Sequence, residues 1–264
     1  MARNEGRVRE KYRGGEEEGR ATRSRYAGLE FYYTKRHLDG YVGRDASVVE
    51  LGCGTGYYAL HFADRCREYL GVDLVPEHVA ALRGKAAKRG LANVRAQLGD
   101  ATCLRELPDG AFDVVLCLGP LYHLPPDERE LVFSECRRIC RRGGVAAFAY
   151  ISRVGVYAGG CVHDQLRERY PNERANAFLL EQSRDDVNPD LFFYTMPEEI
   201  EAVARRYGFE KVKNLGTDFF VTMSAVEAMD DEKFELMRPL LDSMADSESC
   251  TGMSNHALLV CKRG

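Results

Sequence analysis

The feature that most constrains the fold of this sequence is a regular alternation of short apolar runs with helix-like segments, which begins near residue 46. The apolar runs are residues 46–51, 69–72, 93–98, 112–118 and 144–151, and the helical patterns are residues 55–65, 76–90 and 127–141. Strands that read as continuous apolar runs are buried on both faces, and helices supply the crossovers that parallel strands need. The alternation therefore predicts an α/β fold with a doubly wound, mostly parallel sheet.

Local signals mark several helix ends. Pro76 stands at the first position of one predicted helix and Gly90 just past its end, as helix boundaries favour. Asp127 followed by Glu130 predicts a capping box at the start of helix 127–141. The remaining predicted elements are helix 24–42, helix 197–208, strand 209–217, helix 226–244 and strand 256–261.

The bulk composition limits the class of protein. With 264 residues, 45% hydrophobic and 30% charged, the chain has the balance of a globular protein with a full core. Its net charge of −4 argues against a general nucleic-acid binder. No apolar run approaches the ~20 residues of a membrane span, and the first residues lack the apolar stretch of a signal peptide. We expect a cytoplasmic protein with neither nucleic-acid nor membrane partners.

The nine cysteines do not predict a metal site. No pair has the C-x-x-C spacing of zinc sites, and several cysteines fall inside apolar runs, where cysteine behaves as a small hydrophobic residue. We expect free thiols in a reducing compartment and no bound metal.

A glycine-rich loop follows the first predicted strand, with the sequence E-L-G-C-G-T-G at residues 50–56. Glycines at a strand-to-helix turn let the backbone approach a ligand closely, and the helix N-terminus adds free N–H groups. The G-x-G-x-G spacing is one residue shorter than the dinucleotide motif. Glu50 would repel a pyrophosphate and suits a cationic ligand such as an ammonium group. An NAD-dependent oxidoreductase is therefore the weaker alternative.

Two further carboxylates follow the next predicted strands. Asp73 ends the second strand in G-V-D-L, where a carboxylate can bind both ribose hydroxyls, or could cap the helix that begins at Pro76. Asp100 follows the third strand in G-D-A, where it could accept from an adenine amino group or simply form a surface turn.

These motifs together resemble the class I S-adenosylmethionine-dependent methyltransferases. The matching stretches are E-L-G-C-G-T-G at 50–56, G-V-D-L at 71–74, G-D-A at 99–101 and F-D-V-V-L-C-L-G-P-L-Y-H-L at 112–124. The resemblance covers about residues 46–153, and the last stretch is similar to small bacterial enzymes that act on small molecules. It implies a Rossmann-like, seven-stranded, mostly parallel sheet with its last strand antiparallel and helices on both faces, and S-adenosylmethionine as cofactor.

The residues expected to bind the cofactor are Tyr26, Glu50, Gly52, Cys53, Gly54, Gly56, Tyr57, Asp73, Leu74, Asp100, Ala101, Leu118 and Gly119. The candidate catalytic residues are Tyr122 and His123, at the end of the fourth strand, which faces the methyl group in this architecture. His123 could act as a general base or pack at the start of the next helix. Tyr122 could steer a substrate or pack in the core.

The acceptor is expected to be a small molecule. The L-G-P-L turn at residues 118–121 differs from the Asn/Asp-Pro-Pro-aromatic turn of enzymes that methylate nucleic-acid bases. A protein methyltransferase and a non-catalytic cofactor-binding module remain as alternatives, because methyl transfer needs no diagnostic nucleophile.

The domain organisation is expected to comprise a flexible basic arm over residues 1–25, a core over residues 26–153 and 196–264, and an inserted helical cap over residues 154–195. The arm carries eight Arg and Lys against five Glu, which suits either a solvated tail or a segment that folds over a ligand. The cap is rich in aromatic residues and arginine, so it could be a lid over the acceptor or ordinary core helices. The N-terminal helical segment with Tyr12 and Tyr26 is a second candidate cover.

Overall fold

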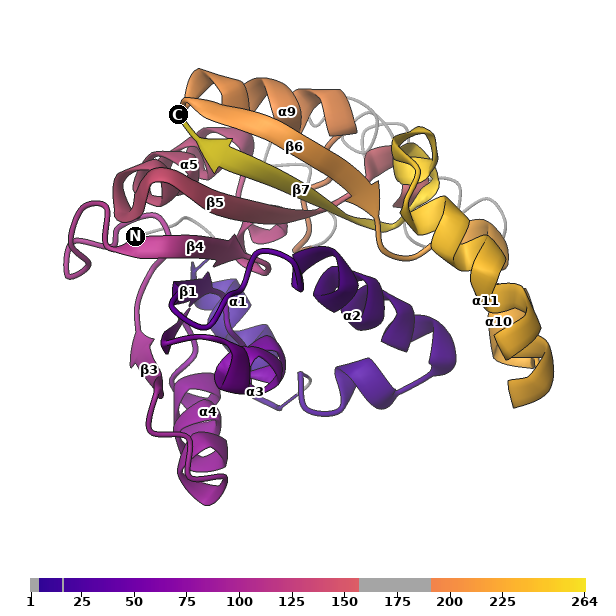
Figure 1. Cartoon of the computed structure of the whole chain (residues 1–264), viewed down its shortest axis with the longest axis horizontal. Helices are drawn as coiled ribbons and strands as arrows, with labels where there is room; N and C mark the ends of the chain where they lie inside the picture. The colour runs from indigo at the N-terminus through magenta and orange to yellow at the C-terminus, as the bar shows by residue number, and fades with distance from the viewer. Residues whose placement is uncertain (1–4, 16, 157–190) are drawn as a thin grey trace.

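The computed structural model describes residues 5–15, 17–156 and 191–264. Its strands are β1 Ser47–Leu51, β2 Glu68–Asp73, β3 Val94–Leu98, β4 Phe112–Cys117, β5 Cys140–Ile151, β6 Phe209–Gly216 and β7 His256–Arg263. They form a seven-stranded sheet in the order β3-β2-β1-β4-β5-β7-β6 (Figure 1). Strands β1 to β5 pair in parallel, whereas β7 runs antiparallel to both β5 and β6. The predicted sheet is confirmed.

Helices cover both faces of this sheet. The first face carries α2 Arg25–Leu38, α3 Tyr57–Phe62 and α4 Pro76–Lys88, and the second carries α5 Pro126–Ile139 and α9 Pro197–Arg206. Alternate residues of a strand enter the two cores: Val48 of β1 packs on the first face, while Val49 and Leu51 pack on the second. This is why the central strands read as continuous apolar runs.

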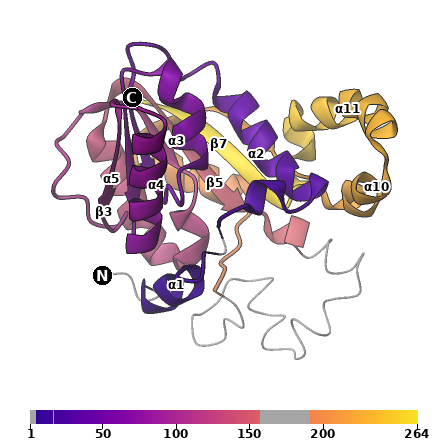
Figure 2. The same ribbon diagram turned by 90° about the horizontal axis from the view of Figure 1, so that it is seen from below.

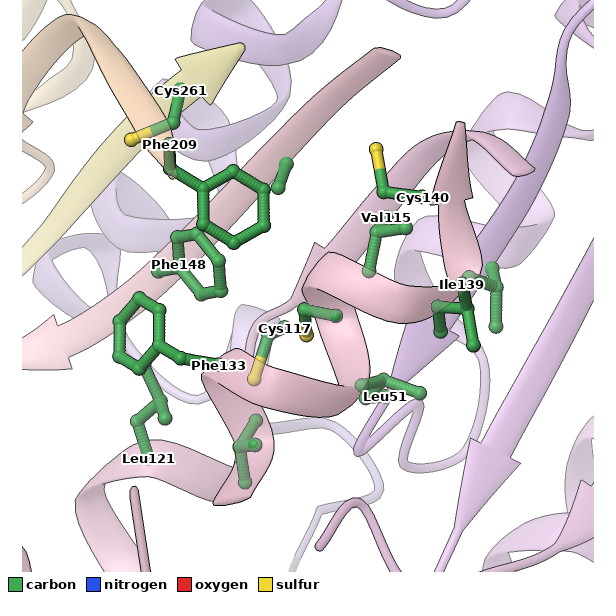
Figure 3. Packing of buried hydrophobic residues seen from close by; sticks show 14 of the residues in the cluster. Leu51, Val115, Cys117, Leu121, Phe133, Ile139, Cys140, Phe148, Phe209 and Cys261 are labelled. Atoms are coloured by element: carbon green, nitrogen blue, oxygen red, sulfur yellow. The ribbon is translucent and has the colours of Figure 1, made fainter. Parts of the chain in front are cut away.

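The second core contains a cluster of closely packed aromatic rings. Figure 3 shows Phe133 of α5, Phe148 of β5 and Phe209 of β6 packed close to one another in this core. The ring centroids of Phe133 and Phe148 lie 4.3 Å apart, and those of Phe148 and Phe209 lie 5.3 Å apart. All three side chains are fully buried, so this core holds α5 and the late strands in place.

Two local predictions were wrong. Helix α5 begins at Pro126 with Pro125 at its N-cap, so Asp127 lies inside the first turn and forms no capping box. The predicted helix 226–244 is two helices, α10 Met223–Ala228 and α11 Asp231–Ala245. The helical conformation is interrupted between them because the Asp230 side chain accepts a hydrogen bond from the Lys233 amide at 2.8 Å and so caps a new helix.

Helices α10 and α11 stand beside α2, on the side away from α4, in both views (Figures 1 and 2). Tyr26, Leu29 and Tyr33 of α2 form a separate apolar cluster with them. No helix among the described residues is both long and apolar enough to cross a membrane.

Part of the predicted N-terminal arm is helical. Residues Glu5–Tyr12 form α1, which Figure 2 shows beneath α4 and the sheet, and Arg20–Thr22 form the short 3-10 helix η1. Most of the predicted cap, residues 157–190, lies outside the described residues. Its end returns to the sheet, where the Arg153 amide donates to the Thr195 carbonyl at 3.0 Å.

Candidate functional site

A cavity of about 910 Å³ opens at the carboxyl ends of β1, β2, β3 and β4. Parallel strands bring their carboxyl ends to one edge of the sheet, which is where ligands of α/β folds bind. The predicted site residues that line it are Glu50, Gly52, Cys53, Gly54, Tyr57, Asp73, Leu74, Asp100, Ala101, Leu118, Gly119, Tyr122 and His123. Residues that are dispersed along the first half of the chain thus meet in one space.

The three loop glycines have different roles. Gly52, Gly54 and Gly56 all have positive φ angles, of 72°, 52° and 90°. A Cβ atom at Gly52 would lie 2.8 Å from Pro120 Cδ, and one at Gly56 would overlap the Leu82 side chain. A Cβ at Gly54 would meet no atom and would point into open space. Gly52 and Gly56 therefore permit close packing, whereas Gly54 keeps the cavity free.

Glu50 is a buried carboxyl group on the wall of the cavity. It lies on the same face of β1 as Val48, and its Oε2 accepts a hydrogen bond from the Tyr69 hydroxyl at 2.7 Å. Burial raises the pKa of Glu50 to about 8; the Tyr69 hydrogen bond opposes this shift, and nearby Asp73 adds to it. A cationic ligand group would favour the ionised form.

Asp73 ties the glycine loop to helix α4. Its Oδ2 accepts from the Gly54 amide at 2.7 Å, and its Oδ1 accepts from the Val75 amide at 2.8 Å and lies 3.1 Å from His78 Nδ1. The Val75 bond closes a turn just before α4, but the N-cap of that helix is Val75 and no side chain caps it, so the predicted helix-cap role of Asp73 is wrong. Lone-pair positions on the carboxylate remain for a ligand, so the turn contacts and a binding role are compatible.

His78 was not predicted as a site residue. Burial disfavours its charged form, but the Asp73 carboxylate, together with Glu17 and Glu77, outweighs this and raises the pKa of His78. Its Nε2 atom is buried and has no hydrogen-bond partner among the described residues, although the side chain lines the cavity. The signal that could have found it is its place on the first turn of α4, five residues after Asp73.

Asp100 is half-buried and lies in a turn after β3, in the wall of the cavity. Its Oδ1 accepts from the Thr102 amide at 2.9 Å and from the Thr102 hydroxyl at 2.7 Å. The turn interpretation is therefore correct. The predicted contact with an adenine amino group stays a prediction, which the position of Asp100 in the cavity wall permits.

Tyr122 and His123 lie on the 3-10 helix η3 Pro120–His123, directly after β4. The Tyr122 hydroxyl donates to the Leu118 carbonyl at 3.2 Å, and burial raises the pKa of Tyr122. His123 Nε2 lies 3.0 Å from the Tyr12 hydroxyl of α1, and its Nδ1 lies 3.4 Å from the Leu191 carbonyl. The chain thus brings the N-terminal arm and the end of the predicted cap to the same histidine.

Two predicted cofactor residues do not line the cavity. Gly56 acts through the packing described above. Tyr26 lies on the face of α2 that packs against Phe219 and Val226 rather than on the face toward the cavity. In place of Tyr26, Arg20 from the N-terminal arm lines the cavity; it donates to Glu30 at 3.1 Å, and its guanidinium carbon lies 4.9 Å from the Phe31 ring centroid.

No group of three His, Cys, Asp or Glu side chains within the described ranges is arranged to hold a metal ion. The cysteines of those ranges are free thiols, and most of them are buried.

Comparison with known proteins places this geometry in a family. Residues 48–144 match the model of a methyltransferase domain. The fold, the cavity at the strand ends and this match identify that part of the chain as a class I, S-adenosylmethionine-dependent methyltransferase domain.

Individual relatives agree with this assignment. The chain is 35% identical over 165 residues to an uncharacterized methyltransferase of Mycobacterium sp. (strain JLS), covering 60% of each chain. It is 34% identical over 102 residues to the ajmaline N-methyltransferase of Rauvolfia serpentina, covering 37% of this chain and 33% of that protein. The chain thus spans less than two thirds of the length of these relatives.

A solved structure shows the same fold. The magnesium protoporphyrin IX methyltransferase of Synechocystis PCC 6803, determined with bound S-adenosylhomocysteine, superposes with a TM-score of 0.58 at 15% identity. The superposition covers 90% of this chain and 82% of that one.

Proposed function

We propose that this protein transfers a methyl group from S-adenosylmethionine to a small-molecule acceptor. The observation that carries the proposal is that the buried Glu50 carboxyl, the Asp73–His78 pair and Gly54, with the open space beside it, all line the same cavity. The family match and the relatives support it.

The residues present fit this cofactor. Glu50 is a buried carboxyl group suited to an ammonium, Gly54 leaves room for close backbone approach, and Asp73 with the unpaired His78 Nε2 offers polar partners for ribose hydroxyls. Neither the loop spacing nor Glu50 suits a pyrophosphate. When bound, S-adenosylmethionine would supply a methyl group activated by positively charged sulfur.

The remaining work of the chain is to orient the acceptor and exclude water. Val8 and Tyr12 of α1 and Arg20 of η1 line the cavity together with the glycine loop, so the N-terminal arm forms part of its wall. A site that is walled by its own N-terminal segment suits a small acceptor better than a protein tail. The ajmaline and magnesium protoporphyrin IX enzymes are also named for small-molecule acceptors.

The cofactor assignment predicts a clear difference between two ligands. In isothermal titration calorimetry, S-adenosylhomocysteine should bind with a Kd on the order of micromolar, about −8 kcal/mol, and NAD should give no signal. Binding of NAD without binding of S-adenosylhomocysteine would replace the methyltransferase proposal by the oxidoreductase alternative. Binding of S-adenosylhomocysteine with no methyl transfer to any acceptor would favour a non-catalytic module.

Glu50 predicts a pH dependence of cofactor binding. Because its pKa lies at about 8 in the free protein, its carboxyl group is mostly protonated below that pH and must release a proton to pair with an ammonium. The affinity for S-adenosylhomocysteine should therefore rise from pH 6 to pH 7.5, by at most roughly tenfold per unit. Glu50→Gln should bind more weakly at pH 7.5 and show a flat profile over this range.

A companion variant tests the cause of that profile. Tyr69→Phe removes the hydrogen bond that lowers the pKa of Glu50, so the rise in affinity should move to higher pH. Equal slopes in the wild-type protein and in Glu50→Gln would show that Glu50 does not pair with the ligand.

A further inference from the structure

The Tyr12 hydroxyl lies against the Nε2 atom of His123, and the other contacts of that histidine define which atom donates the hydrogen bond. The Leu191 carbonyl can only accept a hydrogen bond, so the His123 Nδ1 that faces it at 3.4 Å carries the proton. In the neutral imidazole, Nε2 then holds a lone pair, and the Tyr12 hydroxyl at 3.0 Å donates to it. The backbone thus sets the tautomer in which Nε2 is a proton acceptor, and a phenol from the chain itself is bound there.

The surroundings of this contact are aromatic. The ring centroid of His123 lies 5.4 Å from that of Tyr12, 4.9 Å from that of Tyr122 and 5.0 Å from that of Phe192. The Tyr12 and Tyr122 rings meet His123 edge to face and the Phe192 ring is tilted against it, and such a cluster of rings favours another aromatic ring in the same space. The Tyr122 hydroxyl donates to the Leu118 carbonyl, so of the two predicted catalytic residues His123 is the one that is set to receive a proton.

From these contacts we propose that the acceptor is a phenol, and that its hydroxyl takes the place on His123 Nε2 which the Tyr12 hydroxyl holds in this structure. The inference rests on the proposed methyltransferase function and adds the substrate class. In this structure the Tyr12 hydroxyl therefore occupies the position of the substrate hydroxyl. The N-terminal helix α1 must shift for the acceptor to enter.

The pKa values favour a phenol over an aliphatic alcohol as the acceptor. An unperturbed histidine has a pKa of about 6.5 and a phenol one of about 10, so transfer of the proton from the phenol to the histidine must overcome a difference of roughly 3.5 pKa units. An aliphatic hydroxyl resembles water, with a pKa of about 15.7, and the gap would be roughly 9 units. In the complete reaction the phenol proton goes to Nε2 and the oxygen forms a bond to the methyl carbon. The bond from that carbon to sulfur breaks, and its electron pair stays on sulfur.

The test uses the full chain saturated with S-adenosylhomocysteine and the probe 4-nitrophenol, whose absorbance reports its ionisation. Tyr12→Phe keeps the ring but removes the competing hydroxyl, so it should bind 4-nitrophenol about threefold to tenfold more tightly than the wild-type protein, the usual range for one neutral hydrogen bond. Nitrobenzene, which has no hydroxyl, should show no such gain. The nitro group makes this probe more acidic than an ordinary phenol, so His123 can take its proton. At a pH where the free probe is un-ionised, the bound probe should absorb as the phenolate, and His123→Gln should abolish this phenolate absorbance.

The matched control is Tyr32→Phe, since Tyr32 is an exposed tyrosine of α2 that does not line the cavity. It should bind the probe as the wild-type protein does. Unchanged or weaker binding of 4-nitrophenol by Tyr12→Phe, or no binding to either protein, would overturn the inference while leaving the methyltransferase proposal standing. Failure of S-adenosylhomocysteine to bind would instead overturn the proposed function itself.

Discussion

Gly54→Val should abolish detectable binding of S-adenosylhomocysteine, a loss of at least about 100-fold in affinity, while the chain stays folded. The physical reason is the direction of the missing side chain. A Cβ at Gly54 meets no protein atom, so the added methyl groups would enter the space reserved for the ligand. Calorimetric titration and thermal melting of the same sample would measure both effects.

The cost of the backbone conformation needs its own control. Gly54 has a φ of 52°, where a β-branched residue is strained by roughly 1–2 kcal/mol. Gly110 has a similar φ of 63°, a Cβ there would make only ordinary contact with the Arg141 Cα at 3.9 Å, and it does not line the cavity. Gly110→Val should therefore lose comparable stability and retain full affinity. Normal affinity in Gly54→Val would show that the loop does not approach the ligand.

Asp73→Ala should reduce stability and cofactor affinity together. The substitution leaves the Gly54 and Val75 amides and the buried His78 without their acceptor. Hydrogen bonds to a charged group contribute about 1.5–3 kcal/mol each. We therefore expect a loss of roughly 3 kcal/mol or more in the free energy of unfolding, and of about 1.5–3 kcal/mol in binding. Urea denaturation and calorimetric titration would measure the two.

Asp73→Asn separates charge from shape. The two amides donate to different carboxylate oxygens, and an asparagine has one acceptor oxygen, so it can accept from only one amide and should recover part of the stability. It also removes the charge that raises the pKa of His78. Titration of the His78 ring by NMR should show that pKa fall in the variant. A stable Asp73→Ala protein with normal affinity would contradict both the role of Asp73 in holding the loop and its ribose-binding role.

Most of the residues proposed to bind the cofactor could be predicted from the sequence. The glycine loop, Asp73 and Asp100 each follow directly on an apolar strand, and parallel strands must end at the same edge. The errors arose where local patterns compete. Pro125 and Pro126 displaced the expected capping box, because the helix could begin one residue earlier with Pro126 at its first position. Asp230 divided a continuous helical pattern because its side chain caps a new helix.

By itself, the sequence determined the order of strands and helices, the glycine loop and the set of carboxylates at the strand ends, because these depend on residues close together in the chain. Only the tertiary structure decided which faces of α2 and α4 meet the cavity, turning Tyr26 away from it and His78 toward it. It also decided the contact between Tyr12 and His123, which lie 111 residues apart. The packing of a short, mostly polar helix over a distant strand end depends on the whole assembled surface, and no local pattern encodes it.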